Sequence, residues 1–145
     1  MLFRSAKELF ADGLRTPQRM LEATWQQRVD ALGRGGYARY DESTATRLGE
    51  GAQLLLDTLR GDLRRMRSPH REIQKFPGIG DTGADIFCRE VQAVWPRLRP
   101  FFDQRALAAA RSHGLPDDPK KLAGLVPAEQ IAVLATALVR SSLKA

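Results

Sequence analysis

The chain has 145 residues, a length that suits one domain with a single buried core. Apolar residues make up 43% and charged residues 28%, which excludes a disordered chain, a collagen-like repeat and a disulfide scaffold. Lys and Arg number 23 against 17 Asp and Glu, so the net charge is +6 and an acidic partner is expected. No apolar run is long enough to span a membrane, and we expect a soluble, cytoplasmic protein.

The residues that bind metals are scarce in this sequence. The chain contains one cysteine and two histidines, which lie far apart. One cysteine forms no intramolecular disulfide and cannot ligate a four-cysteine iron–sulfur cluster. The same shortage of ligands argues against a zinc site. We therefore expect neither an iron–sulfur cluster nor any other metal cofactor.

The first five residues look foreign to the protein. Residues 2–5, Leu-Phe-Arg-Ser, match the translation of a common sequencing-adapter tail and lead at once into a helical pattern. Their apolar stretch is too short for a secretory signal peptide. We expect residues 1–5 to be a non-native scar, with the true protein continuing upstream. A natural short start is the alternative.

Helix signals follow one another along the first half of the chain. Residues 16–17, Thr-Pro, form a cap followed by proline at the first helical position. A capping box over 24–27 begins a second helix, which ends near Gly33. Apolar residues then recur every three or four positions over 43–59, which predicts a long amphipathic helix.

The second half continues the helical pattern. A basic connection over 60–67 leads into a short helix over 69–75, and a Gly/Pro-rich break over 76–80 separates this helix from the next. Caps and prolines bound the later helices: Asp103 to His113, Asp117 or Asp118 to Leu125, and Pro127 onward. No stretch has the alternation and β-branched enrichment of a strand. We expect an all-α fold in which residues 6–145 form one helical domain.

Residues 76–84, Phe-Pro-Gly-Ile-Gly-Asp-Thr-Gly-Ala, are the most informative segment. Two glycines one residue apart between helices allow a hairpin too tight for residues with a Cβ. The next helix begins at once, so its free N–H groups form an anion site that suits a phosphate. Such a hairpin holds a nucleic-acid backbone without reading its sequence. A plain Pro-Gly turn between helices is the alternative.

Phe76 to Gly80, Ala84, Trp95-Pro96 and Asp103 together resemble the core of the helix-hairpin-helix DNA glycosylases related to endonuclease III, the HhH-GPD superfamily. The likeness covers about residues 14–112, and the helix-hairpin-helix itself falls at about 69–94. The resemblance implies a multi-helix DNA-glycosylase-like fold, here truncated at its N-terminus. It implies double-stranded DNA as the partner, and we expect a monomer associated with the nucleoid and not with a membrane.

The resemblance also implies roles for individual residues. Asp103 would be the catalytic carboxylate, which supports loss of a base while C1′ of the sugar develops oxocarbenium character. Asp103 fits a helix N-cap equally well, and one aspartate could serve both roles. The expected DNA-binding residues are hairpin backbone groups and basic side chains: Gly78, Ile79, Gly80, Thr82, Gly83, Arg64, Arg65 and Lys75. A solvated basic face is the alternative for these cations, and a monovalent cation at the hairpin is left open.

Three departures from the family's pattern bear on activity. Thr82 stands where bifunctional members carry the lysine that forms a Schiff base with the sugar. Asp81 would cap its helix but repel an approaching phosphate. The gap from Trp95-Pro96 to Asp103 is about two residues longer than in endonuclease III, which could move the carboxylate by several ångströms.

These features favour an endonuclease III-like base-excision-repair protein. Because Thr82 offers no amine, we expect a monofunctional DNA glycosylase, a hydrolase without Schiff-base lyase activity that removes a damaged base. One alternative is a non-catalytic helix-hairpin-helix DNA-binding module that keeps the hairpin and lacks the chemistry. Another is a helical interaction module without nucleic acid, in which the hairpin is only a turn.

Overall fold

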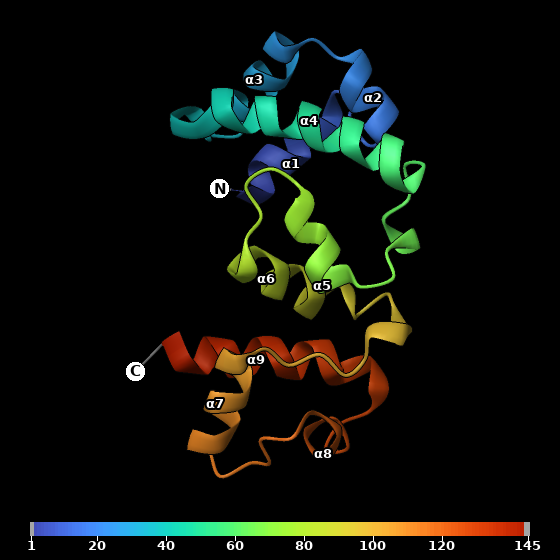
Figure 1. The fold of residues 1–145 in the computed structure, drawn as a ribbon. Coiled ribbons are helices and arrows are strands. Elements are labelled where there is room, and N and C mark those ends of the chain that lie inside the picture. The colour runs from blue at the N-terminus through green and yellow to red at the C-terminus, as the bar shows by residue number, and fades with distance from the viewer. Residues whose placement is uncertain (1, 144–145) are drawn as a thin grey trace. The chain divides into compact units, whose positions relative to one another are not determined.

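A computed structural model of the chain describes residues 2–143 (Figure 1). Over this range the chain forms nine α-helices and short 3-10 turns, without a strand, so the all-α prediction is confirmed. Packing of the backbone divides the range into two compact units. Unit 1 comprises residues 2–68 and 72–79, and unit 2 comprises residues 69–71 and 80–143.

The α-helices are α1 (Leu2–Ala11), α2 (Pro17–Glu22), α3 (Trp25–Arg34), α4 (Asp41–Leu59), α5 (Pro69–Glu72), α6 (Asp81–Val91), α7 (Gln104–Ser112), α8 (Pro119–Ala123) and α9 (Ile131–Leu143). The 3-10 turns are η1 (Ala38–Tyr40), η2 (Leu63–Arg65), η3 (Ile73–Lys75), η4 (Pro96–Leu98) and η5 (Ala128–Gln130). Most helices lie within a few residues of their predicted bounds. The last helix differs, because η5 separates Pro127 from α9.

Unit 1 is built around the long helix α4. Both α2 and α3 pack against α4, and α1 packs against α3 (Figure 1). The core of the unit consists of small and branched apolar side chains from four of its segments: Leu9, Leu14, Ala31, Leu32 and Ala45. Burial of this apolar surface is the main force that holds the short helices together, since α2 and α3 are too short to be stable alone.

Side-chain caps start α2 and α3 where the sequence predicts them. The Thr16 hydroxyl accepts a hydrogen bond from the N–H of Arg19 at 3.1 Å. Thr24 and Gln27 form the reciprocal capping box, with each side chain accepting the backbone N–H of the other residue. Local sequence therefore determines where these two helices begin.

A buried arginine ties three helices of unit 1 together. Arg28 of α3 is 8% exposed, and its Nε donates to the carbonyl of Ala45 in α4 at 3.0 Å. Its Nη1 donates to the carbonyl of Met20 in α2 at 2.8 Å. Gly49 leaves room for this guanidinium, because a Cβ there would lie 2.7 Å from Nη2 of Arg28. Hydrogen bonds from one side chain thus satisfy carbonyls of two neighbouring helices.

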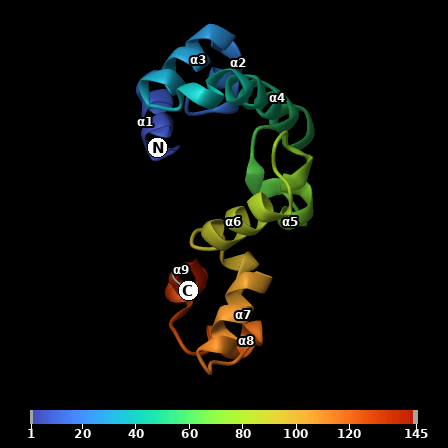
Figure 2. The same cartoon turned by 90° about the vertical axis from the view of Figure 1, so that its left-hand side faces the viewer.

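Unit 2 has an apolar core of its own. In it α7 packs against α9, and α6 also contacts α9 (Figure 2). The core is rich in alanine, which lets the helices approach closely: Phe102, Ala106, Ala109, Ala110, Leu122, Ile131, Ala135, Leu138 and Val139. Asp118 caps α8 by accepting the N–H of Lys121 at 3.0 Å, as the sequence predicts.

The segment predicted to be a scar begins the first helix. Met1 lies outside the described residues, and residues 2–5 form the first turn of α1. Ser5 is 1% exposed and lies against Gly35, where a Cβ would come within 2.5 Å of the Ser5 Cα. The foreign origin of residues 1–5 and the single domain over 6–145 stay predictions. Among the described helices, none is both long and apolar enough to cross a membrane.

Candidate nucleic-acid interface

The segment that the sequence predicts to be a helix-hairpin-helix comprises α5 and η3, the loop over 76–80, and α6. The N–H of Ile79 donates to the carbonyl of Phe76 at 3.2 Å and closes the loop. The segment contributes to both units, because the assignment changes between Arg71 and Glu72 and again between Ile79 and Gly80.

Of the two hairpin glycines, only Gly78 requires the conformational freedom of glycine. Its φ is +83°, in the left-handed region, and a Cβ would lie 3.0 Å from Nη1 of Arg47. Gly80 is extended, with φ −106° and ψ −159°, and a Cβ there would meet nothing within 4 Å. The prediction that both glycines exclude a Cβ is therefore wrong for Gly80, whose backbone and surroundings accept a side chain.

Helix α6 begins without a side-chain cap. Gly80 is its N-cap residue, and the Gly80 carbonyl accepts the N–H of Ala84 at 2.9 Å. The N–H groups of Gly80 and of the first three residues of α6, which end at Gly83, donate to no acceptor within the described chain. Gly80, Asp81 and Thr82 are exposed. Four consecutive amides are thus available to an anion, with the Asp81 carboxylate beside them.

The predicted basic residues of unit 1 differ in whether an acidic side chain neutralises their charge. Arg64 pairs with Asp62, with Nε 3.0 Å from Oδ1 and Nη2 2.9 Å from Oδ2, and these hydrogen bonds lower the pKa of Asp62. Arg65 and Lys75 are exposed and form no hydrogen bond or ion pair through their side chains within residues 2–143. Arg65 and Lys75 therefore offer more available charge to a phosphate than Arg64 does.

Arg47 is an exposed residue of α4 that the sequence did not indicate as part of the interface. Three of its atoms, Nη1, Cδ and Cζ, lie within 3.0–3.2 Å of where a Gly78 Cβ would be. No other described residue forms a hydrogen bond or ion pair with the Arg47 side chain. Nothing in the sequence marks this arginine, because its place beside the hairpin depends on how α4 packs within unit 1.

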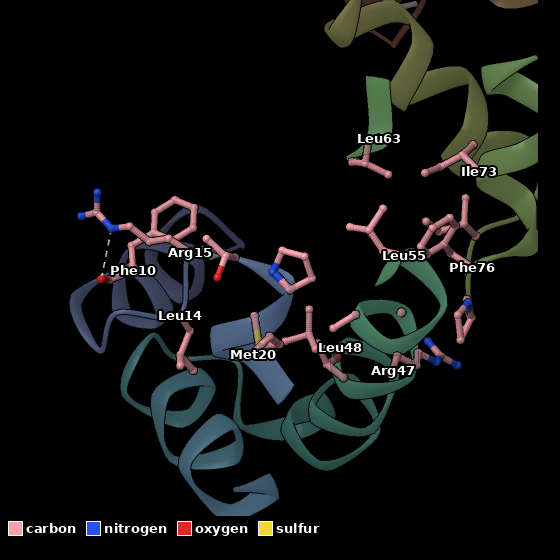
Figure 3. Close-up of a pocket in the computed structure, with 18 residues that line it drawn as sticks. Phe10, Leu14, Arg15, Met20, Arg47, Leu48, Leu55, Leu63, Ile73 and Phe76 are labelled. Carbon is pink, nitrogen blue, oxygen red and sulfur yellow. Dashed lines mark hydrogen bonds between the residues drawn. The ribbon is translucent and has the colours of Figure 1, made fainter. Parts of the chain in front are cut away.

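An apolar groove of about 720 Å³ in unit 1 reaches the hairpin (Figure 3). Side chains from α1, α2, α4, η2, η3 and the hairpin loop line it, among them Leu48, Leu55 and Phe76. Arg15 and Arg47 lie toward opposite ends of the labelled group, and Nε of Arg15 donates to the Phe10 carbonyl at 3.4 Å (Figure 3). Sequence patterns did not indicate this groove, because its lining comes from six separate segments.

In unit 2, Asp103 is the N-cap of α7. Its Oδ1 accepts the N–H of Ala106 at 3.1 Å, so the capping interpretation is confirmed. Its Oδ2 lies 3.0 Å from Nη1 of Arg89, which donates a hydrogen bond to it. The residue is 8% exposed. Asp103 is thus a buried carboxylate in which each oxygen already accepts one hydrogen bond, and its catalytic role stays a prediction.

A buried glutamine holds the chain just before Asp103. Gln92, which follows α6, is fully buried, and its Oε1 accepts the N–H of Phe101 at 2.9 Å. Its Nε2 donates to the Phe101 carbonyl at 2.9 Å, and Nε of Arg99 donates to the Gln92 carbonyl at 2.7 Å. These bonds attach the loop before Asp103 to the end of α6, so side-chain hydrogen bonds fix the position of the loop.

A second pairing in unit 2 joins the start of the helix-hairpin-helix to α6. Nε2 of His70 lies 2.7 Å from Oδ1 of Asp85, and both side chains are about one-third exposed. The His70 ring centroid is 6.0 Å from that of Phe101. The contact joins α5 to α6 and to the segment that precedes Asp103.

The residues present do not fit an iron–sulfur cluster. Cys88 is the one cysteine of the chain, it is 1% exposed, and burial raises the pKa of its thiol to about 11. Within residues 2–143, no group of three or more His, Cys, Asp or Glu side chains is arranged to hold a metal ion. A cluster that needs four thiolates has no ligand set here.

Comparison with known proteins places this geometry in a known fold. The sequence matches no protein-family model and no curated protein. A solved structure described as a trapped endonuclease III–DNA covalent intermediate, an estranged-adenine complex, matches with a TM-score of 0.58 and 20% sequence identity. The match covers 93% of this chain and 62% of the chain in the solved structure. This chain therefore spans less than two thirds of the length of the solved one. The chain therefore has an endonuclease III-like all-α fold, as its hairpin sequence predicts.

Proposed function

We propose that the protein binds double-stranded DNA through its hairpin and removes a damaged base by hydrolysis, as a monofunctional glycosylase. The fold supports DNA binding, because the matched structure is a complex with DNA. The observation that carries the proposal is the row of four N–H groups from Gly80 to Gly83, which have no acceptor within the described chain. Such a row binds a phosphate on any DNA sequence.

The charge of the chain supports the same partner. The net charge is +6, and Arg65 and Lys75 carry exposed, unpaired positive charge near the hairpin in sequence. Lys/Arg contacts to phosphates give affinity that falls steeply with salt. Asp81 opposes this attraction at the first position of α6. We therefore expect modest affinity for duplex DNA that depends strongly on ionic strength.

The proposed chemistry is hydrolysis of the bond between the base and C1′ of its sugar. The base leaves with the electron pair of that bond and takes up a proton, and the oxygen of a water molecule bonds to C1′. Asp103 would orient this water, accept its proton and stabilise the positive charge at C1′. Arg89 and the N–H of Ala106 hold the carboxylate in one orientation. Each oxygen of Asp103 keeps a further lone pair for a water molecule.

A second candidate function is DNA binding without catalysis. The burial of Asp103, with 8% of its surface exposed, favours this candidate, as does its ion pair with Arg89. Capping a helix and neutralising a buried arginine are structural roles that explain a carboxylate at this position without any catalysis.

The remaining properties follow from the same proposal. We propose that the protein acts as a monomer at the nucleoid, in the cytoplasm. We further propose that it works without an iron–sulfur cluster, because its single, buried cysteine cannot supply the ligands. A monovalent cation at the hairpin loop stays a candidate ion.

Asp103→Asn tests the chemistry, and Asp118→Asn is a control for the capping role alone, because Asp118 is exposed and Asp103 is buried beside Arg89. Both aspartates cap a helix through a side-chain oxygen, and asparagine preserves that role. The substrates are duplex oligonucleotides that each carry one oxidised, alkylated, deaminated or mismatched base. Base release is measured as strand breakage after alkali, and far-UV circular dichroism verifies the fold of each variant. We expect Asp103→Asn to lose at least about a hundredfold in rate, and Asp118→Asn to keep the wild-type rate.

Three results separate the candidates. Base release that depends on Asp103 and not on Asp118 supports the glycosylase. A wild-type protein that binds duplex DNA but releases no base from the whole panel supports non-catalytic binding. A protein that does not bind duplex DNA at low salt contradicts both candidates.

A further inference from the structure

We infer that Arg47 of α4 binds a DNA phosphate beside Gly78 of the hairpin loop, within unit 1, an inference that rests on the proposed DNA binding. Arg47 is remote in sequence from every basic residue of the 60–75 run. Its guanidinium nevertheless lies against the backbone of Gly78, the residue at which the hairpin turns. A positively charged side chain of α4 thus lies beside the hairpin loop.

The absence of a side chain at Gly78 lets Arg47 approach the hairpin loop closely. A Cβ there would lie 3.0 Å from Nη1, 3.1 Å from Cδ and 3.2 Å from Cζ of Arg47. These separations are shorter than ordinary van der Waals contacts, so a Cβ at Gly78 would require the Arg47 side chain to shift by a few tenths of an ångström. The glycine therefore permits both the left-handed turn and the approach of the arginine.

The charge of Arg47 is available, unlike that of several other arginines in unit 1. Arg34 pairs with Glu8 and Asp12, and Arg28 is buried among carbonyls. Arg47 is exposed and makes no hydrogen bond or ion pair within the described chain. Its five N–H donors can thus face solvent or a ligand.

We assign a phosphodiester to this arrangement because the inference rests on the proposed DNA binding, and the chemistry of the site suits it. The planar guanidinium can donate two parallel hydrogen bonds to the oxygens of one phosphate. The adjoining wall of the groove is apolar, including Leu48 and Phe76 (Figure 3). Such a wall offers the guanidinium no acceptor that competes with a phosphate, and it lowers the local dielectric constant, which strengthens the charge interaction.

The test is salt-dependent binding of a fluorescently labelled DNA duplex to the full chain, measured by anisotropy. The variants are Arg47→Ala and Arg47→Lys, and Arg19→Ala is the matched control. Arg19 is also an exposed arginine of unit 1, and the apolar groove does not include it. Because all three changes are on the surface, the urea midpoint should stay at the wild-type value in each variant.

We expect Arg47→Ala to weaken binding about tenfold. The logarithm of the association constant falls linearly with the logarithm of the salt concentration, and this slope should become about 0.9 less steep. Arg47→Lys should keep the slope, since the charge remains, and lose part of the affinity, since two parallel hydrogen bonds are no longer possible. Arg19→Ala should leave the slope unchanged.

The failures of the two proposals are distinguishable. If Arg47→Ala keeps the affinity and the salt slope of the wild type, and its binding is still lost at high salt, the role of Arg47 is overturned. DNA binding by the hairpin would then stand. An equal loss in Arg19→Ala and Arg47→Ala would also overturn that role, because only net charge would then matter. A wild-type chain that does not bind duplex DNA at low salt would overturn the proposed function itself.

Discussion

Arg89 and Asp103 form an ion pair inside unit 2, with Nη1 of Arg89 3.0 Å from Oδ2 of Asp103. The two side chains are 11% and 6% exposed. Nε of Arg89 is buried and has no hydrogen-bond partner among the described residues. Asp103 is therefore the counter-charge of a guanidinium that is only partly satisfied, and this structural role exists whether or not the carboxylate takes part in catalysis.

The first prediction concerns the stability of this pair. Arg89→Met alone leaves the Asp103 carboxylate buried without its cation and should lower the free energy of unfolding by about 3–5 kcal/mol. The double variant Arg89→Met/Asp103→Asn should recover most of that loss, because it removes both charges and keeps the N-cap. Urea denaturation measures each value, with Arg105→Ala, an exposed residue of α7, as the control. Costs that add in the double variant would contradict an energetic coupling between the two side chains.

The second prediction concerns the thiol of Cys88. Its pKa is raised from 9.0 to about 11, chiefly by burial and further by Asp85. The thiolate fraction at about pH 8 is therefore about a hundredfold lower than for an ordinary thiol, and iodoacetamide should label the native protein correspondingly slowly. The unfolded chain in urea, which is the control, should react at the ordinary rate.

The sign of the pH effect follows from the same shift in pKa. Because the folded pKa lies above the ordinary value, the neutral thiol contributes stability that is fully present below pH 9.0 and is lost as the pH rises toward 11. Rapid labelling of folded protein at about pH 8 would show that the core around Cys88 opens often.

The helix starts were predictable because each depends on a few adjacent residues. Thr16, Thr24 and Asp118 occupy the capping positions that the sequence indicates, and each accepts an N–H of the first turn. Such bonds form between residues three apart, so no tertiary structure is needed to predict them. The hairpin loop was predictable for the same reason.

The partners of Asp103 and Gly78 could not be predicted, because each comes from a distant segment. Arg89 is separated from Asp103 by a loop whose path depends on the bonds from Gln92 to Phe101. The contact of Arg47 with Gly78 requires the packing of unit 1. One local expectation failed as well, since the sequence does not distinguish the left-handed Gly78 from the extended Gly80.

The third prediction separates the two hairpin glycines. Gly78→Ala places a Cβ at φ +83° and against Arg47, so it should weaken duplex binding and cost about 1–2 kcal/mol of stability. Gly80→Ala should change stability and affinity little, because its backbone is extended and its surroundings are open. Anisotropy and urea denaturation of both variants check the difference. Equal losses in the two variants would show that access to the Gly80 backbone, rather than its conformation, limits binding.

The last prediction follows from Thr82, an exposed residue in the first turn of α6. A covalent Schiff base needs an amine that reaches C1′ of the sugar, and a hydroxyl cannot form one. Borohydride should therefore trap no complex between the wild-type protein and damaged duplex DNA, and base release should leave intact abasic strands. Thr82→Lys should permit trapping if the neighbouring amides hold the phosphate as proposed, since lysine then stands at the position that the sequence resemblance assigns to the amine of bifunctional glycosylases.

Two control variants make the trapping result specific. Lys75 is the nearest lysine in sequence, is exposed and belongs to η3, so Lys75→Ala should leave the wild-type result unchanged. Combining Thr82→Lys with Asp103→Asn should reduce trapping again, because release of the base, which Asp103 is proposed to support, exposes C1′ to the amine. A wild-type protein that traps efficiently, and that stops doing so in Lys75→Ala, would identify Lys75 as the nucleophile. That outcome would make the protein a bifunctional enzyme and would contradict the monofunctional assignment.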